Sequence, residues 1–411
     1  MKSETPERKD PVRTDRLLRQ KYTQYIIPAV ITYAALSLNE FVDSMLVSNL
    51  LDSDALAIVT LGAPVVMVCT ATYSLLGIGG ANLYAVSLGK RDHGAAGRSL
   101  TASCVTSSAA GIVLMIAGLI FCGPLTDYLC KTPGLREDFR TYLYVLILAA
   151  PLEILVLTVT AFLPSAGHPG ASTAVNVIAN VINIGMDYVY IRIFHMGVEG
   201  AAWATLTGYI CGALFMAVLL AAGKIKLYFS RDIKGSMASL GEITKLGRPD
   251  AINQIGLSIQ YAVCNRLAAI YAGANGLVAY SICLQTGSVI SIFVASVIGT
   301  SVTMMAVLRG QQDYQGERHV LGTAFANQIT VCAAGMILAE LFAARIAGLY
   351  NVTDPEQLAL SVHAMRIFAF MYIPRYAVIV YYCYLKVIGF SRYSSVMSAL
   401  DSFAELKAKL K

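Results

Sequence analysis

Charged residues and the motifs of common catalytic sites are both scarce in this sequence. Only 14% of its 411 residues are charged, 56% are hydrophobic, and the mean hydropathy is +0.62. A soluble domain carries about 25% charged residues, so the composition excludes an ordinary soluble globular protein. The nine cysteines form no CxxC pair and the five histidines no HExxH motif. We therefore interpret the cysteines as small apolar packing residues and do not predict an enzyme.

The chain also lacks a signal-peptide pattern at its start, because its first apolar run follows a charged segment. Residues 1–21 hold seven basic side chains interleaved with acids. We interpret this segment as solvated and cytoplasmic under the positive-inside rule, with a partner-binding arm as the alternative. Its pattern indicates neither a nucleic acid nor an obligate protein partner.

Apolar runs dominate the remaining sequence, and ten of them are long enough to cross the hydrocarbon core of a bilayer. They lie at residues 22–51, 55–88, 99–123, 140–164, 171–194, 198–223, 249–272, 276–307, 320–348 and 360–388. The loops after spans two, six and eight carry basic residues, whereas the loops after spans one and seven carry none. This alternation predicts a multi-pass protein of the inner (cytoplasmic) cell membrane, in contact with membrane lipids, with a cytoplasmic N-terminus.

The apolar run at residues 174–193 carries a polar stripe. Four polar residues recur in it at spacings of four, three and four: Asn176, Asn180, Asn183 and Asp187. On a helix they fall within an arc of about 40–60°, which cannot face lipid. Interhelical hydrogen bonds explain the asparagines as well as a binding site does. A charged aspartate is too costly in a membrane to serve only as a contact between helices. We therefore predict a cation site that includes Asp187.

Acidic residues also stand out in the first and fourth spans. In the first, Asn39 and Asp43 lie four residues apart on one helix face, with Glu40 about 60° away. In the fourth, Glu153 stands beside Pro151 and is either a further proton carrier or an acid paired with a neighbour. The first span therefore supplies a second buried acidic face.

The sequence consists of two copies of one unit, joined by a long polar connection. Landmark residues recur at offsets of 221 to 223: Pro28 and Pro249, Asp92 and Asp313, Tyr128 and Tyr350, Pro133 and Pro355, Pro151 and Pro374, Gly167 and Gly389. Six spans in the first copy is an even number, so both copies enter the membrane in the same orientation. This is the parallel-repeat plan of many secondary transporters.

The predicted fold is an all-α integral membrane protein with two helical bundles, the second of about four helices. Its parts are a cytoplasmic N-terminal segment at 1–21, a six-helix bundle at 22–223, a cytoplasmic linker at 224–248, an incomplete bundle at 249–392 and a polar tail at 393–411. By the repeat, the second copy would end near residue 445, so spans eleven and twelve are expected to be missing. Asp401, Glu405 and three lysines argue against a spanning helix in the tail.

Several motifs, in their order along the chain, resemble one transporter family. They are FVDSMLV after Pro28, LGKRDHGAAGRSL after span two, and NVINIGMDYVYI followed by MGVEGAAWATLTG. Together with the repeat, they make residues 20–392 similar to the multidrug and toxic compound extrusion (MATE) family. The resemblance implies a twelve-helix antiporter that expels organic, often cationic, small molecules against the entry of protons or sodium ions.

The resemblance also implies a cation site in the first bundle. The candidate residues for cation coupling and substrate contact are Asp43, Tyr142, Asn180, Asn183, Asp187 and Thr205. The polar faces independently indicate Asp43, Asn183 and Asp187, whereas the resemblance adds Thr205 and Tyr142. Two carboxylates that share a low-dielectric pocket repel each other, so a proton or a sodium ion can neutralise the pocket. We expect sodium at Asp43, Asn183, Asp187 and Thr205, or a proton, and no other cofactor.

The sequence departs from the family pattern at several positions. Pro164 stands where many relatives have arginine, and Cys264 occupies the repeat position of Asp43. Span seven has Asp250 at its edge and Arg266, and span ten has no acid, so the acidic pair of the sodium-driven bacterial branch is missing. We therefore expect ion coupling to run through the first bundle.

Two other interpretations of the sequence are open. A lipid-linked oligosaccharide flippase of the same superfamily would need a wide basic cavity, whereas the apolar spans here carry mostly acidic charges. A truncated product without transport activity would fold as the first bundle and part of a second. Transport by the 411-residue chain would exclude this last interpretation.

Overall fold

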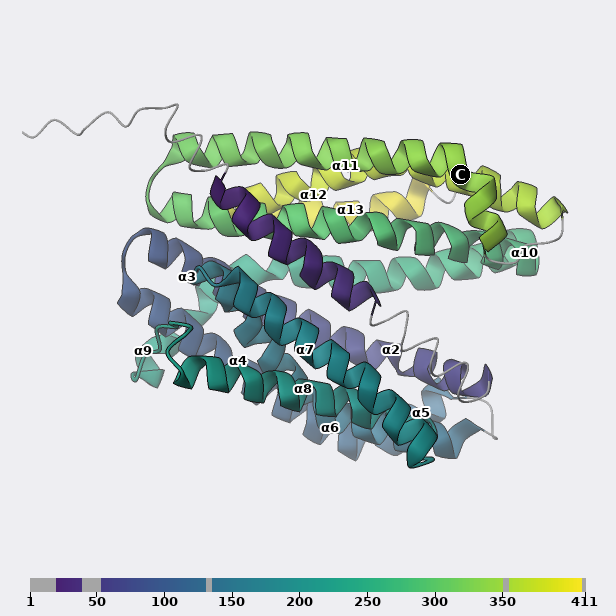
Figure 1. The fold of residues 1–411 in the computed structure, drawn as a ribbon, viewed down its shortest axis with the longest axis horizontal. Helices are drawn as coiled ribbons and strands as arrows, with labels where there is room; N and C mark the ends of the chain where they lie inside the picture. Colours follow the sequence, from purple (N-terminus) through teal and green to yellow (C-terminus); the bar gives the residue numbers. More distant parts are fainter. Residues whose placement is uncertain (1–19, 39–52, 131–134, 350–354, 409–411) are drawn as a thin grey trace, which may run out of the picture.

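The computed structural model describes residues 20–38, 53–130, 135–349 and 355–408. Within these ranges the regular structure is helical and no strand occurs, which confirms the all-α prediction. Eight of the described helices are long and apolar enough to cross a membrane. The helices run roughly along one long axis and form two bundles, one above the other in the first view (Figure 1).

Helices from residues 53–221 form the first bundle. They are α2 (Ser53–Tyr73), α3 (Gly79–Gly89), α4 (His93–Ile120), α5 (Cys122–Leu129), α6 (Arg136–Ser165), α7 (Pro169–Tyr188) and α8 (Val198–Ala221). A π-helical turn at Ser74–Ile78 joins α2 to α3 without a loop, and another at Val189–Ile193 extends α7. The longest helix, α6, is buried along most of its length and forms the centre of this bundle.

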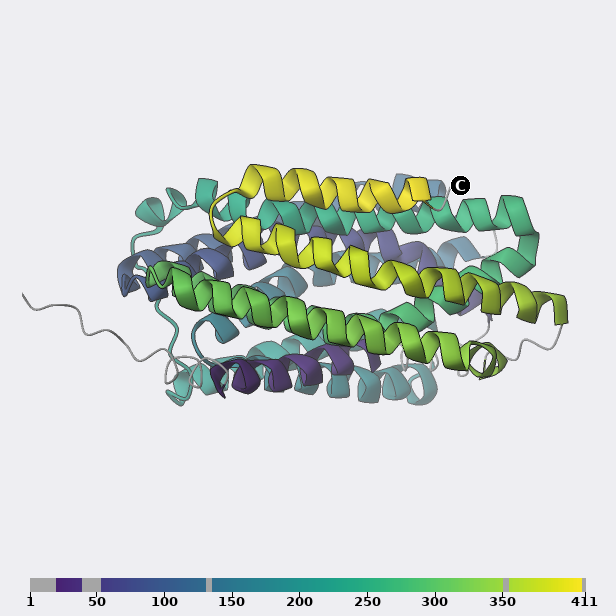
Figure 2. The ribbon, with the colours of Figure 1, turned by 90° about the horizontal axis from the view of Figure 1, so that it is seen from above.

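Helices from the later part of the chain form the second bundle. After the short α9 (Ile233–Met237) come α10 (Leu240–Gly310), α11 (Tyr314–Leu349), α12 (Pro355–Val387) and α13 (Ser391–Ala408). Straight, the 71 residues of α10 would be about 107 Å long. Yet both of its ends lie against α3, which is only about 16 Å long. The chain therefore doubles back within α10, which supplies two spans (Figure 2).

The repeat is visible in the backbone as well as in the sequence. Asp92 and Asp313 each accept a hydrogen bond at a helix start, from the backbone N–H of Ala95 (2.8 Å) and Gly316 (2.9 Å) respectively. The residue before each aspartate has a positive φ, and so do Gly167 and Gly389 at the later loops. Residues that correspond in the two copies of the repeat thus have the same local structure, because the same capping and turn residues bound the corresponding helices.

The helix over residues 20–38 lies between the two bundles and contacts both (Figure 1). Towards the second bundle, the Tyr22 hydroxyl lies 3.0 Å from Ser301 Oγ. Towards the first, Thr173 of α7 donates a hydrogen bond to the Pro28 carbonyl oxygen at 2.9 Å, and its hydroxyl lies 2.8 Å from that of Thr32. This helix therefore joins the two halves instead of packing within the first bundle alone.

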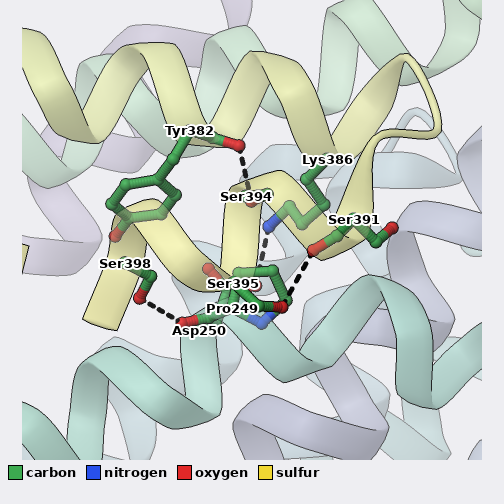
Figure 3. Close-up of polar contacts among 8 residues, drawn as sticks. All are labelled: Pro249, Asp250, Tyr382, Lys386, Ser391, Ser394, Ser395 and Ser398. Carbon is green, nitrogen blue, oxygen red and sulfur yellow. Dashed lines mark hydrogen bonds and ion pairs between the residues drawn. The ribbon is translucent and has the colours of Figure 1, made fainter. Parts of the chain in front are cut away.

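The segment after residue 392 differs from the predicted polar tail, because most of it forms the helix α13. Ser394 donates to the Tyr382 carbonyl oxygen and Ser398 to that of Pro249, each at 2.7 Å (Figure 3). In the first bundle, Ser172 of α7 makes the matching bond to the Thr160 carbonyl oxygen at 3.1 Å. Hence α13 occupies the place in the second bundle that α7 has in the first, and Ser391, Ser394, Ser395 and Ser398 are buried.

The two bundles meet closely at a pair of glycines related by the repeat. A Cβ atom on Gly89 would lie 2.8 Å from Gly310 Cα, and one on Gly310 would lie 2.7 Å from Gly89 Cα. Each added atom would also overlap a backbone oxygen of the other bundle, that of Val307 or Val86. The pairs 86/89 and 307/310 share an offset of 221, so this contact lies on the pseudo-twofold axis of the molecule.

Candidate functional site

The buried polar residues of α7 form the centre of the candidate site. Asp187 is fully buried and Asn183 is 5% exposed. One helical turn separates them, so both side chains leave α7 on the same face. At these two positions the polar stripe of α7 therefore faces the protein interior.

A hydrogen bond joins α7 to α8 at this site. Asn183 Nδ2 donates to Thr205 Oγ1 at 3.4 Å, and Thr205 in turn donates to the Ala201 carbonyl oxygen at 3.1 Å. The structure thus brings together Asn183 and Thr205, which polar periodicity and family resemblance indicated separately.

Glycines of α8 allow the close approach of the two helices. A Cβ atom on Gly208 would lie 2.7 Å from the Ala179 carbonyl oxygen and 3.1 Å from Asn183 Cβ. A Cβ atom on Gly212, one turn further along, would lie 3.1 Å from Ala179 Cβ. Small residues at interhelical contacts let backbones approach in membrane proteins. These glycines therefore position Asn183 beside Thr205.

The other stripe residues have different surroundings. Asn176 Nδ2 donates to the Ser172 carbonyl oxygen on its own helix at 2.8 Å. Asn180 is partly buried, and its Nδ2 atom has no hydrogen-bond partner among the described residues. Of the three asparagines, Asn176 is thus satisfied locally, Asn183 binds α8, and Asn180 retains a buried donor.

Tyr142 and Asp43 complete the predicted set. Tyr142 of α6 is 7% exposed, lies against Gly62 of α2 and belongs to the apolar cluster that contains Ala201. Tyr142 thus shares an apolar cluster with Ala201, which lies one helical turn before Thr205 on α8. Asp43 lies outside the described residues, so its place in the site stays a prediction.

The chemistry of this site suits a small hard cation. Carboxylate, amide carbonyl and hydroxyl oxygens are ligands that alkali and alkaline-earth ions accept, and a carboxylate also binds a proton. The described residues contain no group of three or more His, Cys, Asp or Glu side chains that could hold a transition metal. Oxygen ligands of this kind are compatible with reversible binding of a proton or a small hard cation.

Glu153 is a second buried acid in the first bundle. It lies on α6, is 6% exposed, and is hydrogen-bonded to Tyr209 of α8. Tyr209 follows Thr205 by one helical turn, which places Glu153 close to the candidate site. Of the two roles predicted for Glu153, the hydrogen bond with Tyr209 fits that of an acid paired with a neighbour.

Sequence reasoning missed one charged pair altogether. Lys386 of α12 is 1% exposed, and its Nζ atom lies 2.6 Å from Asp250 Oδ2 of α10 (Figure 3). In the sequence, Lys386 stands at the end of an apolar span, where a lysine is read as an exposed flanking residue. Asp250 at the edge of span seven did indicate a buried charge, but its partner Lys386 is 136 residues away in the sequence.

Comparison with known proteins identifies the family. A family model described as MatE matches residues 28–189 and matches again at residues 249–404. The chain belongs to the MATE family. The two matches correspond to the two copies of the repeat, and with eight candidate membrane helices among the described residues they establish a multi-pass membrane protein.

Individual relatives are distant in sequence but similar in fold. The chain is 22% identical to the probable multidrug resistance protein YoeA of Bacillus subtilis (strain 168), over 85% of this chain and 77% of that protein. It is 25% identical to the multidrug export protein MepA of Staphylococcus haemolyticus (strain JCSC1435), over 56% of this chain and 51% of that protein. A crystal structure of a MATE protein in complex with MaD5 matches with a TM-score of 0.86 at 22% identity, over 93% of this chain and 86% of the other.

Proposed function

We propose that this MATE protein is a secondary active efflux antiporter for organic cations. A proton or sodium gradient drives it through Asp43, Asn183, Asp187 and Thr205. The observation that carries the proposal is the fully buried Asp187, one turn from the hydrogen bond that joins Asn183 to Thr205. A charge in a membrane interior is expensive to maintain and is retained for ion or substrate pathways.

The relatives support the substrate class. The matched proteins of Bacillus and Staphylococcus are described as a multidrug resistance and a multidrug export protein. The match to the staphylococcal protein spans about half of its length, 51%. Small organic molecules are thus the proposed substrates of this chain, and the buried acids of the first bundle favour cationic ones.

Ion binding would bias the two access states of the transporter. A proton or sodium ion at Asp187 removes the net charge that the helices α7 and α8 otherwise enclose. The neutral site tolerates closer packing of the surrounding helices, whereas the charged site favours water or a cationic group nearby. Each ligand shifts the equilibrium only by its different affinity for the two states.

Efflux of a fluorescent cationic dye from proteoliposomes tests the proposal. The purified chain is reconstituted, and a proton or sodium gradient is imposed. We expect Asp187→Asn to abolish gradient-driven efflux, because the amide keeps the size of the side chain but cannot bind a proton. Tyr188→Phe is the matched control, because Tyr188 is adjacent and 51% exposed.

Three results would contradict the proposal. Full efflux by Asp187→Asn would remove the site from the mechanism. Efflux only after extension of the chain to the length of its relatives would show that this chain alone does not transport. No dye movement by either version under either gradient would favour the flippase interpretation.

A further inference from the structure

The ion pair between Asp250 and Lys386 is a second buried charged site, remote in sequence from the one described above. Lys386 keeps 2% of its side-chain surface exposed and Asp250 keeps 19%. An ammonium group has three N–H donors, and Asp250 is its one hydrogen-bond acceptor among the described residues. Serines of α13 surround the pair, but their hydroxyls donate to backbone oxygens instead (Figure 3). Within the described part of the chain, the ammonium therefore has a single ionic contact.

The fold itself does not require this pair, and the repeat provides the internal control. The positions of Asp250 and Lys386 correspond to Ala29 and Pro164 in the first half. The turn three residues after Pro164 and after Lys386 has the same backbone form in both halves, as the positive φ of Gly167 and Gly389 shows. A structure built once with uncharged residues does not need a lysine and an aspartate in its second copy. A charge pair that stability does not demand indicates a function.

The carboxylate of this pair lies at the junction of the two bundles. Gly247, one turn before Asp250, packs against the backbone of Leu75 from the first bundle. The hydroxyl groups of Tyr33 and Tyr73, also from the first half, are within electrostatic range of Asp250. Tyr382 of α12 is within range as well. Asp250 is therefore an anionic group that interacts electrostatically with tyrosines of both halves, and it is the more exposed member of the pair.

We propose that Asp250 is a second cation-binding carboxylate, which receives an organic cation between the bundles while Lys386 serves as its resident counter-cation. Carboxylates attract cations directly, and tyrosine rings stabilise organic cations through their π faces. Lys386 holds the carboxylate ionised when no substrate is present and competes with the substrate for it. This inference rests on the proposed function, because it assumes an organic cation as substrate.

The proposal predicts opposite effects for the two members of the pair. Asp250→Asn removes the binding group, whereas Lys386→Met removes its competitor. If the pair only stabilised the fold, either change would leave one buried partner unsatisfied, and both would weaken the protein in the same direction. The signs therefore separate a binding role from a structural one.

The test measures the binding of tetraphenylphosphonium to the purified full chain in detergent by calorimetry. The pH is fixed at about 8, where carboxylates are ionised. We expect Asp250→Asn to lower the affinity at least about tenfold and Lys386→Met to raise it about fivefold or more. The double variant Asp250→Asn/Lys386→Met, which leaves no unpaired charge, should bind as weakly as Asp250→Asn. Ser391→Ala is the control, because Ser391 contributes its backbone oxygen to the cluster.

Two outcomes would overturn this inference alone. One is unchanged affinity in both single variants, and the other is a parallel loss of affinity and thermal stability in both, with recovery in the double variant. Failure of the wild-type chain to bind any organic cation would instead contradict the proposed function.

Discussion

The glycine contact between the bundles gives a sharp prediction about conformational change. If the halves rock against each other about an axis perpendicular to the pseudo-twofold axis, the contact of Gly89 with Gly310 must form when this end of the molecule closes and separate when it opens. Alanine at position 310 would place its Cβ atom 2.7 Å from Gly89 Cα, where ordinary van der Waals contact needs about 3.4–4 Å. The added atom also overlaps the Val86 carbonyl oxygen, so the closed arrangement must widen by more than about 1 Å at this point.

The cost of this change sets the size of the expected effect. Overpacking by one methyl group costs about 1–3 kcal/mol, and here the clash exists only in the closed arrangement. The equilibrium should therefore shift towards the state that is open at this end by about 5- to 150-fold. Gly89→Ala should shift it by a similar amount, because its Cβ atom meets the equivalent atoms at 2.8 Å.

Distance measurement between spin labels checks this shift. Labels introduced as unnatural amino acids at Lys90 and Gln315, both exposed, leave the native cysteines untouched. We expect Gly310→Ala to add a population at longer distance in the reconstituted protein. Gly322→Ala on α11 is the control, because a Cβ atom there has nothing within 4 Å. A wild-type distance distribution in Gly310→Ala and Gly89→Ala, with reduced thermal stability, would refute a movable contact.

Three further predictions concern the site and the repeat. Thr205→Val should lower the free energy of unfolding by about 1–3 kcal/mol, because it leaves the buried Asn183 amide without its acceptor. Thr205→Ser keeps the hydroxyl and should have the stability of the wild type. Thermal unfolding in detergent measures both variants. Gly208→Val should lower the free energy of unfolding by about 1–3 kcal/mol, because it forces α7 and α8 apart. Gly185→Ala should leave stability unchanged, because a Cβ atom there has nothing within 4 Å. Equal stabilities of the two variants would contradict the proposed packing. Asp92→Ala and Asp313→Ala should each cost about 1 kcal/mol, because they remove equivalent helix caps, and a cost for one but not the other would show that the repeat is not energetically symmetric.

Composition and local periodicity determined the class of this protein. A low charged fraction and long apolar runs allow only a membrane setting, because each span must satisfy its own backbone hydrogen bonds. The arc of Asn183 and Asp187 follows from helix geometry alone, so their burial could be predicted without the fold. The repeat was visible because the same turns need the same prolines, glycines and aspartates in each half.

Contacts between distant segments were decided by the tertiary structure alone. The sequence could not show that α10 doubles back, that the helix over residues 20–38 joins the two bundles, or that α13 packs as a helix where a polar tail was predicted. It also hid Lys386, because a lysine at a span end looks the same whether it faces water or a buried aspartate 136 residues away. Periodicity reports the face on which a side chain lies, whereas its partner depends on how the helices pack.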